Sequence, residues 1–495
     1  MKYQLSANFS LRSPAIVLHV AALLLSLTPS LLAQDDSALS AMVAMEKVIV
    51  NSIEQSEKSV VAIARVRKGS IGDPTDPNFV PNEFGTGVVI DAAGLILTNY
   101  HVLGRIEEND YYVWIQHRPF QVTKVMKADS VKAADPWTDL AVLQIDARDL
   151  QPIKFGDASK LRKGQIVISL GNPYAIARDG EPSASWGIIS NLSRKATLNP
   201  SDLDAERNAK SIHHYGTLIQ TDAKLNLGTS GGALLNLQGE MIGLTTSLAA
   251  MQQYESSAGF AIPVDDTFKR VVNALKKGDQ PEFGFLGIAP SDIAARARRQ
   301  GSFGVRIERV VDGSPAAFAK LLPGDFITEI DHQPVRDTSE LMRDLGSRAV
   351  DSEVQLTVLR SDLRPLQIPV KLSKKPVLFD LPTYSQNQPQ SWRGMQVEYT
   401  TAIRDFPLVS HLVDEKGCVV ITSVERDSAA WQAGLRPRLF VSHVNGKRVS
   451  NPREFFTAVE KLNEAVTLQL TRPQGDDGTM ITVQPSADAS NPQAD

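Results

Sequence analysis

A succession of short apolar segments between residues 60 and 262 constrains the fold of this chain most strongly. The segments are rich in Val, Ile, Leu and Thr and are separated by Gly, Pro, Asn and Asp, which is typical of β-strands joined by turns. The expected strands are residues 60–66, 85–91, 95–100, 112–116, 121–126, 140–145, 166–169, 185–191, 217–220, 241–247 and 259–262. Many short strands predict an all-β sandwich or barrel, which an amphipathic helix at residues 265–276 would close.

The remainder of the chain contains an internal repeat. One copy begins at Phe285-Leu-Gly-Ile and the other at Trp392-Arg-Gly-Met. Each copy has a strand, a Ser-x-Ala-type helix start, a turn, another strand and a second helix, expected at residues 339–345 and 452–461. The polar, proline-containing stretch 384–390 is expected to be a linker, and the tail after Pro485 to be disordered.

Composition favours a soluble chain of several domains. The chain has 495 residues, with 42% hydrophobic and 22% charged residues. Its net charge of −4 gives no sign of the basic surface that nucleic-acid binding needs. Cys418 is the single cysteine, so no intramolecular disulfide can form, and it is expected to be a small buried hydrophobe.

The N-terminus is expected to be a signal peptide over residues 1–33. Lys2 and Arg12 supply positive charge, residues 15–27 are almost all apolar, and Ala33 ends a possible cleavage site. The alternative is an uncleaved anchor in the inner membrane, but the apolar run is short for a spanning helix, so we favour cleavage and export. Residues 35–57 then show apolar side chains at helical spacing, typical of core packing or of an arm that packs on another subunit.

A glycine-rich loop at residues 222–233 is the first candidate for chemistry. Gly228 and Gly231-Gly232 bracket Thr229-Ser230, and glycines there allow the sharp turn and close backbone approach that an exposed nucleophile needs. Taken alone, such a motif is more often a small-residue turn between two strands.

Two upstream residues change that balance. His101 ends a strand and has the pKa range of a general base, and Asp139 precedes an apolar strand from which it could orient His101. Asp135 and Asp91 are rival carboxylates in turns. Histidine, then aspartate, then Ser230 is the order of the chymotrypsin-type fold. The adjacent His213 and His214 are expected to be an exposed loop pair, and no metal site is predicted.

The chain resembles the HtrA/Deg family of trypsin-like serine proteases over about residues 38–485. The resemblance rests on eight stretches: Gly85-Thr-Gly-Val-Val-Ile, Leu97-Thr-Asn-Tyr-His-Val, Thr138-Asp-Leu-Ala-Val-Leu, Gly171-Asn-Pro, Trp186-Gly-Ile-Ile-Ser, Gln220-Thr-Asp-Ala, Gly228-Thr-Ser-Gly-Gly-Ala-Leu-Leu-Asn and Gly259-Phe-Ala-Ile-Pro. It implies a mainly β chain with a chymotrypsin-like double β-barrel protease domain at 34–277. Two PDZ domains (β-sandwich-like, α+β) would follow at 281–376 and 392–485, with a linker at 377–391 and a disordered tail at 486–495.

The resemblance also implies residue roles. His101 would be the general base, Asp139 its orienting carboxylate and Ser230 the nucleophile, with the N–H groups of Gly228 and Ser230 as the oxyanion hole. The residues around the specificity pocket would be Lys224, Leu225, Thr245, Thr246 and Ser247.

Two residues depart from the family pattern. Thr229 stands where the family usually has Asn, and Lys224 where it usually has a small residue. If the ammonium of Lys224 points into the pocket, an acidic side chain is accepted. If it extends to solvent, which we favour, the pocket is apolar and prefers side chains like those of Val, Ala or Leu.

In the first PDZ domain, the residues expected to bind a peptide carboxylate are Phe285, Leu286, Gly287 and Ile288. In the second, Arg393-Gly394-Met395 is a weaker version of this loop. Residues 68–82 match the position of a variable regulatory or oligomerisation loop in the family.

The function implied is an exported, periplasmic, ATP-independent endopeptidase for unfolded or misfolded proteins, without a cofactor. Its PDZ domains would bind peptide C-termini, and it would assemble as homotrimers or larger oligomers. Two alternatives stay open: a catalytically idle chaperone or scaffold on a protease fold, and a signalling protease with one membrane-protein target.

Overall fold

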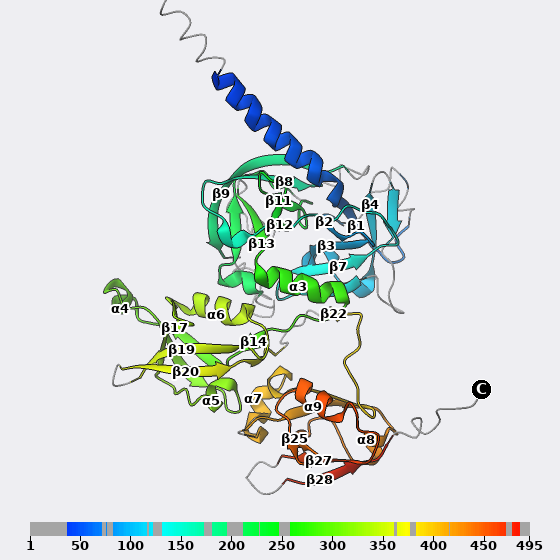
Figure 1. Ribbon diagram of the computed structural model, residues 1–495, viewed down its shortest axis with the longest axis vertical. Helices are drawn as coiled ribbons and strands as arrows, with labels where there is room; N and C mark the ends of the chain where they lie inside the picture. The colour runs from blue at the N-terminus through cyan, green and yellow to red at the C-terminus, as the bar shows by residue number, and fades with distance from the viewer. Residues whose placement is uncertain are drawn as a thin grey trace, which may run out of the picture.

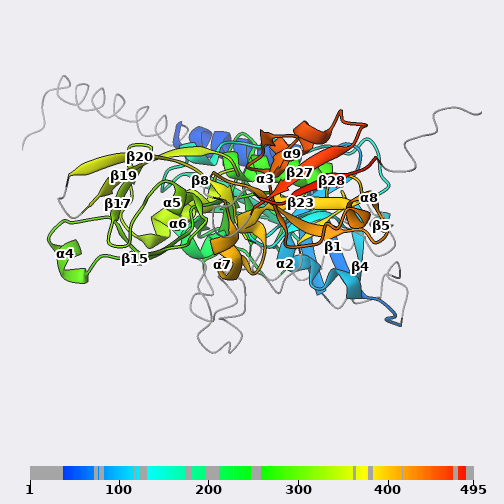
Figure 2. The same cartoon turned by 90° about the horizontal axis from the view of Figure 1, so that it is seen from below.

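The protein is described by a computed structural model. It covers residues 37–71, 76, 83–115, 118–121, 131–172, 181–195, 211–226, 228–246, 258–360, 364–376, 383–414, 416–471 and 478–485. A unit of two β-sheets lies at one end of the molecule, and two smaller α+β units follow it along the long axis (Figure 1). After the domains that the resemblance implies, we label these the protease unit, the first PDZ unit (residues 281–376) and the second PDZ unit (residues 392–485). Seen along the long axis, the two PDZ units lie on opposite sides (Figure 2).

The first sheet of the protease unit has the strand order β22-β6-β7-β3-β2-β1-β4-β5. Its strands in this unit are β1 (Val60–Arg67), β2 (Glu83–Asp91), β3 (Leu95–Asn99), β4 (Asn109–Ile115), β5 (Arg118–Gln121), β6 (Val131–Asp135) and β7 (Leu140–Gln144). Strand β3 is buried on both faces. Its Leu95 and Leu97 side chains join one apolar core, while Ile96 points into another, because successive side chains of a strand alternate between faces.

The second sheet of the protease unit is a closed barrel with the order β10-β13-β12-β11-β8-β9. Its strands are β8 (Ile166–Gly171), β9 (Ser183–Arg194), β10 (Leu218–Thr221), β11 (Ala233–Leu235), β12 (Met241–Thr246) and β13 (Gly259–Pro263). The expected closing helix is α3 (Asp266–Lys277), which begins where the Asp265 carboxylate accepts the Phe268 N–H. Phe268, Val271 and Leu275 of α3 are buried in the core that both sheets share. The predicted mainly β architecture is thus confirmed.

The two PDZ units repeat one topology. The first has the sheet order β15-β16-β17-β19-β20 and the second β23-β24-β25-β27-β28, and in each a short strand pairs off the middle strand. The first unit contains β14 (Gly284–Phe285), β15 (Ile288–Asp292), α4 (Ala295–Arg299), β16 (Val305–Val310), α5 (Pro315–Phe318), β17 (Phe326–Ile330), β18 (Gln333–Pro334), α6 (Thr338–Ser347), β19 (Glu353–Leu359), β20 (Pro365–Lys371) and β21 (Ser373–Lys374). The second contains β23 (Met395–Tyr399), α7 (Phe406–Val409), β24 (Val419–Val424), α8 (Ala429–Gln432), β25 (Phe440–Val444), β26 (Lys447–Arg448), α9 (Pro452–Val459), β27 (Val466–Leu470) and β28 (Met480–Val483). Cys418 is buried in this second unit, as expected.

The stretch expected to be only a linker contributes a strand to the protease unit. Strand β22 (Tyr384–Ser385) pairs antiparallel with β6, and the Gln386 N–H donates to the Lys132 carbonyl oxygen. A strand of two residues is too short to show alternating apolar and polar side chains, so no local pattern predicts β22. The chain between the PDZ units is therefore attached to the protease sheet.

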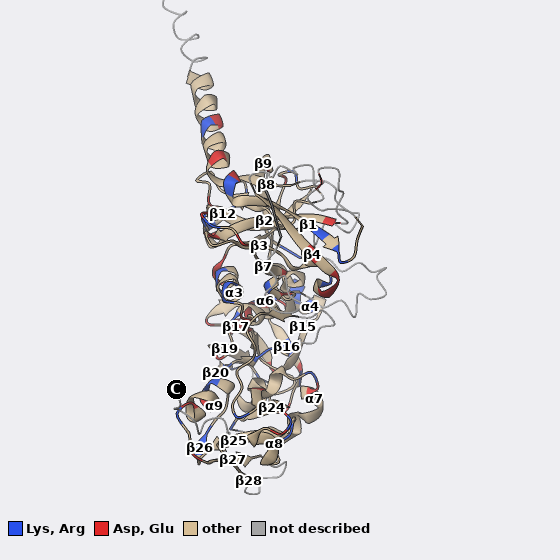
Figure 3. Cartoon of the chain, turned by 90° about the vertical axis from the view of Figure 1, so that its right-hand side faces the viewer, with Lys and Arg blue, Asp and Glu red and all other residues tan. Residues whose placement is uncertain are grey.

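A helix over residues 37–56 precedes β1 and projects from the far end of the protease unit (Figure 1). Its C-terminal part packs on the protease unit through Ile49 and Ile53, and the Ser52 and Ser56 hydroxyls donate to the carbonyls of Leu237 and Gly239. The projecting part is mostly uncharged (Figure 3) and exposes three large apolar side chains: Leu39, Met42 and Val43. The C-terminal part of the helix therefore fits the core-packing interpretation of its apolar stripe. The exposed N-terminal part fits the interpretation as an arm that packs on another subunit.

Among the described residues, no helix is long and apolar enough to cross a membrane. The expected signal peptide at residues 1–33 and the tail at 486–495 lie outside the described residues. Most of the loop at 68–82 does so as well.

Candidate active site

The turn between β6 and β7 carries Asp139 into the interior of the protease unit. Asp139 is 3% exposed and has a positive φ of 55°, which Asp tolerates better than most residues. Asp135 at the start of the turn accepts hydrogen bonds from the N–H groups of Trp137 and Thr138 and from the Thr138 hydroxyl. Asp135, a rival candidate by sequence, therefore folds the turn and does not face His101.

His101 lies in α2 (Tyr100–Leu103), directly after β3, and faces the Asp139 carboxylate. Its Nδ1 atom is 3.0 and 2.9 Å from the two carboxylate oxygens, and its backbone N–H also donates to one of them at 3.0 Å. Asn99 and Tyr100 tie the same two segments together by donating to the Asp139 carbonyl oxygen. A carboxylate on Nδ1 selects the tautomer whose Nε2 atom carries no proton and can accept one.

The loop that carries Ser230 is fixed by strand β12. Gly231 donates its N–H to the Thr245 carbonyl, Thr245 donates its N–H to the Gly232 carbonyl, and the Thr245 hydroxyl donates to the Thr229 carbonyl at 2.5 Å. Ser230 itself is 6% exposed. The loop is therefore rigidly attached to the barrel at the position where a nucleophile would be presented.

Thr86 of β2 joins this loop to the His101 side of the site. Its N–H donates to the Ser230 carbonyl, and its hydroxyl donates to the Gly228 carbonyl and accepts from the Asn172 N–H. A Cβ on the neighbouring Gly85 would lie 2.7 Å from Val102 Cγ1 and 3.4 Å from the Ser230 carbonyl oxygen. Glycine at this position thus lets the serine loop and the histidine segment approach the same strand.

The expected pocket residues divide into two groups. Thr245 and Thr246 are buried and bonded to the site, since the Thr246 hydroxyl donates to the Asp139 carboxylate at 3.4 Å. Leu225 is half-buried over Gly259, whose added Cβ would lie 2.6 Å from Leu225 Cδ1. The Lys224 side chain is exposed, and its carbonyl accepts a bond from the Ser185 hydroxyl. Ser247 lies outside the described residues.

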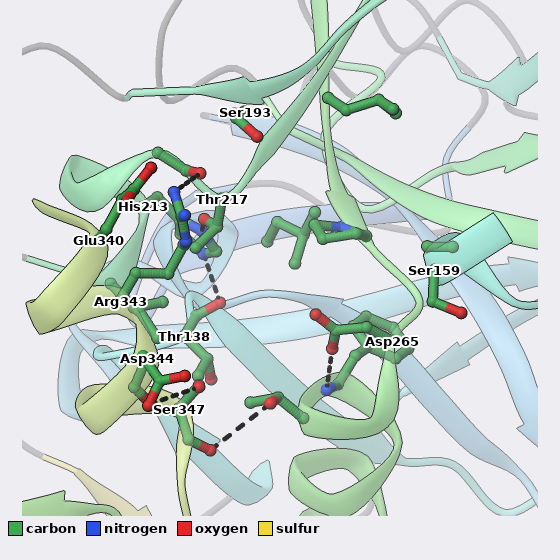
Figure 4. A pocket seen from close by; sticks show the side chains of 18 of the residues that line it. Thr138, Ser159, Ser193, His213, Thr217, Asp265, Glu340, Arg343, Asp344 and Ser347 are labelled. Carbon is green, nitrogen blue, oxygen red and sulfur yellow. Dashed lines mark hydrogen bonds between the residues drawn. The ribbon is translucent and has the colours of Figure 1, made fainter. Parts of the chain in front are cut away.

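Sequence reasoning misplaced His213. It was expected to be exposed, but it is only 2% exposed, in η5 (Ile212–Tyr215). Its Nε2 atom is 2.9 Å from the Thr138 carbonyl oxygen and its Nδ1 atom 2.6 Å from the Thr217 hydroxyl (Figure 4). Burial lowers the pKa of His213, so the neutral imidazole donates to Thr138 and accepts from Thr217. Nothing in its sequence neighbourhood signalled this role, because the partner carbonyl is 75 residues away.

The carboxylate-binding loop expected in the first PDZ unit spans β14 and the start of β15. Gly287 has a φ of 86°, and its carbonyl accepts bonds from the Val311 N–H and the Ser314 hydroxyl. Leu286 is buried, and Phe285 packs edge-on against Phe406 of the second PDZ unit, with ring centroids 6.5 Å apart. Among the described residues, no group of three or more His, Cys, Asp or Glu side chains is placed to hold a metal ion.

Two family models match this chain. A trypsin-like peptidase domain matches residues 85–244, a range that contains His101, Asp139 and Ser230. A PDZ domain matches residues 284–372. Together with the geometry above, these matches define a trypsin-like serine protease that carries a PDZ domain.

Similar proteins narrow the class. The chain is 30% identical over 397 residues to a probable periplasmic serine endoprotease DegP-like of Pseudomonas putida, covering 78% of this chain and 76% of the relative. It is also 30% identical over 409 residues to the periplasmic serine endoprotease DegP of Salmonella typhimurium, covering 81% and 76%. A solved structure of the HtrA-type protease AlgW with a tripeptide shares 26% identity at a TM-score of 0.50, covering 66% of this chain and 97% of AlgW. The chain belongs to the DegP/HtrA family of serine endoproteases, and it is a serine endopeptidase.

Proposed function

We propose that Ser230, His101 and Asp139 form the catalytic triad of this endopeptidase. The observation that carries the proposal is the paired contact of the Asp139 carboxylate with His101 Nδ1 at 2.9 and 3.0 Å, in a buried setting to which the Thr246 hydroxyl adds a bond. In this mechanism His101 Nε2 takes the proton of the Ser230 hydroxyl as Ser230 attacks the scissile carbonyl. His101 then gives that proton to the leaving amine, and an activated water hydrolyses the acyl-enzyme.

The N–H groups of Gly228 and Ser230 are the proposed oxyanion hole. Support comes from the bonds that orient this loop, because Thr86 binds the carbonyl oxygens of both residues. Gly228 adopts a φ of 95°, and a Cβ there would lie 2.6 Å from the Phe84 ring. A single oxyanion donor is typically worth about 10²–10³ in kcat, so this orientation is a large part of the expected rate enhancement.

The specificity pocket is proposed to accept small or medium apolar side chains such as Val, Ala or Leu. The exposed Lys224 side chain supports this preference, because an ammonium in solvent leaves the pocket without a charge. Leu225 over Gly259 supplies apolar surface beside it.

The biological role we propose is degradation of unfolded or misfolded proteins after export to the periplasm. The relatives are named periplasmic endoproteases, and the sequence begins with a segment that resembles a signal peptide. The loop Phe285, Leu286, Gly287 and Ile288 would capture peptide C-termini, with β15 as the strand edge. The exposed apolar part of the N-terminal helix is a candidate contact in a homotrimer or larger assembly.

Digestion of casein by the wild type and by Ser230→Ala tests the proposal. We expect the wild type to cleave casein at many sites and Ser230→Ala to lose at least about 10³ of the rate, as nucleophile removal does in other serine proteases. Thr229→Ser, which keeps a hydroxyl beside the nucleophile, is the matched control.

Three other outcomes would redirect the assignment. Equal cleavage by Ser230→Ala would exclude Ser230 as the nucleophile. No cleavage by the wild type at any temperature, with or without a C-terminal peptide, would favour the chaperone alternative. Cleavage confined to one sequence among several unfolded proteins would favour the signalling alternative.

A further inference from the structure

Trp137 connects the turn that carries Asp139 to the first PDZ unit. The indole is 3% exposed, and its Nε1–H donates to the Gly346 carbonyl oxygen near the end of α6 at 3.0 Å. Phe283 packs against the ring edge-on at 6.4 Å, and the Lys375 ammonium lies over the ring face. Both Phe283 and Lys375 belong to the first PDZ unit, so this unit packs on part of the indole, while the Tyr215 ring of the protease unit packs on it at a centroid distance of 6.2 Å.

Gly346 allows α6 to lie directly on the indole. A Cβ built on Gly346 would be 2.9 Å from Trp137 Cζ2, and the next two nearest atoms, at 3.7 and 3.9 Å, also belong to this ring. A side chain at position 346 would collide with the rigid indole, so α6 can lie this close to Trp137 only because residue 346 is glycine. Gly346 is therefore a contact point at which the position of α6 sets the position of Trp137.

Charges near Trp137 add a second connection. The Asp135 carboxylate is 3% exposed, and burial raises its pKa to about 6. Burial also lowers the pKa of the half-buried Lys375, while the charges of Asp135 and Lys375 favour each other's ionised form. The charge of Lys375, which belongs to the first PDZ unit, thus favours the ionised form of Asp135 at the start of the turn.

A cavity of about 510 Å³ lies between the protease unit and the first PDZ unit and is lined by Thr138, His213, Arg343 and Ser347, among others (Figure 4). Atoms that border a void lack van der Waals partners there. Beside this cavity the Thr138 carbonyl accepts the His213 hydrogen bond, the Trp137 carbonyl accepts the Ile212 N–H, and the Trp137 indole lies against α6.

We propose that the first PDZ unit is a positioning element of the active site. Its contact with Trp137 through Gly346, Phe283 and Lys375 holds the turn 135–139, and thereby keeps the Asp139 carboxylate on His101. Trp137, Gly346 and Lys375 are thus positioning residues for the reaction. This inference rests on the triad roles proposed above, and it requires no peptide in the PDZ groove.

Wedging the contact apart in the full-length chain tests this inference. Gly346→Ala and the larger Gly346→Leu place a side chain against the indole, and both residues are favourable in a helix. The two readouts are the rate at which a fluorophosphonate labels Ser230 and the kcat and KM of a short peptide substrate. We expect both the labelling rate and kcat to fall about 5-fold in Gly346→Ala and more than 20-fold in Gly346→Leu, with KM within about 2-fold, because orientation of the triad affects the transition state.

Two matched controls separate the contact from general effects. Glu460→Leu introduces the same side chain at the corresponding position of the second PDZ unit, since Gly346 and Glu460 each stand nine residues after the helix N-cap, Asp337 or Asn451. Lys371→Met is the control for Lys375→Met, because Lys371, the last residue of β20, is exposed and forms an ion pair with Asp351 of the same unit. We expect both controls to keep wild-type rates and Lys375→Met to lose about 3-fold or more in kcat.

A suppressor variant tests the specific contact. Trp137→Phe removes Cζ2, so Gly346→Ala combined with Trp137→Phe should label faster than Gly346→Ala alone. No rescue would show that the loss does not act through Trp137. Wild-type rates in Gly346→Leu would overturn the inference while leaving the triad intact, whereas failure of the wild type to label at Ser230 would overturn the proposed function itself.

Discussion

The two PDZ units share one fold and differ in what surrounds them. Gly287 and Gly394 have φ values of 86° and 82°, and a Cβ on either would lie 2.2 Å from the Cβ of a serine, Ser314 or Ser428. Each of these serines caps the helix that follows it. Both units thus place a glycine with positive φ against the serine that caps a short helix, α5 in the first unit and α8 in the second.

Their surfaces are used differently. Helix α6 of the first unit lies on the protease unit, where Arg343 donates to the carbonyls of Tyr215 and Gly216. Helix α9 of the second unit lines a cavity of about 950 Å³ together with α3 and the chain around Asn387. A few surface residues, rather than the fold, therefore decide which copy bears on the active site.

The loops proposed to bind peptide carboxylates also differ. In the second unit Trp392 and Met395 exchange backbone hydrogen bonds, so the Met395 N–H is used within the loop. The Arg393 guanidinium donates to the carbonyls of Val483, Leu462 and Glu464, which anchors the loop to its own unit. This arrangement explains in physical terms why the second loop departs from the first in sequence.

The largest expected effect comes from the shared glycines. Gly287→Ala and Gly394→Ala should each destabilise their own unit by roughly 2 kcal/mol or more, because an L-residue is strained at this φ and its Cβ meets a serine. Thermal unfolding measures the stability, and hydrolysis of a short peptide measures the activity. Only Gly287→Ala should lower the activity, and an equal loss in both variants would contradict a special role for the first unit.

A smaller effect is expected from Arg393. Arg393→Met leaves three carbonyl oxygens without their donor and should cost about 1–3 kcal/mol in the unfolding free energy of the second unit. Denaturant titration followed by Trp392 fluorescence measures it. Arg426→Met, at an exposed position of the same unit, should stay within about 0.5 kcal/mol. If Arg393→Met behaves like this control, the anchoring interpretation fails.

The smallest effect concerns pH at the contact between α6 and the protease unit. Burial lowers the pKa of His213 below its usual value of 6.5. As the pH falls through 6.5, the imidazole therefore takes up a proton in the unfolded chain while it stays neutral in the folded chain. His213 therefore contributes stability above about pH 6.5 that is lost toward acid pH. In His213→Gln the denaturation midpoint should fall less between pH 7.5 and 5.0 than in the wild type.

The control is His411→Gln, which removes an exposed histidine of the second PDZ unit and should leave the pH dependence of the denaturation midpoint as in the wild type. An identical pH dependence in wild type and His213→Gln would show that the buried imidazole does not carry this effect.

Several features could be predicted from local sequence. Alternating and continuous apolar runs predict strands because burial of a strand face depends on side chains two residues apart, and β4 and β3 illustrate the two patterns. The order of His101, Asp139 and Ser230, with glycines around the serine, identified the candidate site before any geometry was known. These signals survive in sequence because each depends on a few neighbouring residues.

Other features depend on residues far apart in the chain. Trp137 meets Gly346 across 209 residues, His213 meets Thr138 across 75, and β22 pairs with a strand about 250 residues earlier by the matched pair Tyr384 and Ala134. The hydroxyls of Thr245 and Thr246, both expected in the pocket, bond to the Thr229 carbonyl and the Asp139 carboxylate, partners that lie 16 and 107 residues earlier.

The sequence by itself thus determined the mainly β fold, the repeat and the family, because apolar periodicity and short motifs are local properties. Only the tertiary structure decided which carboxylate faces His101, which histidine is buried and which PDZ unit rests on the active-site turn. The physical reason is that the packing of whole units sets burial and hydrogen-bond partners. The role of a single residue such as Gly346 is therefore visible only from the Trp137 ring against which it packs.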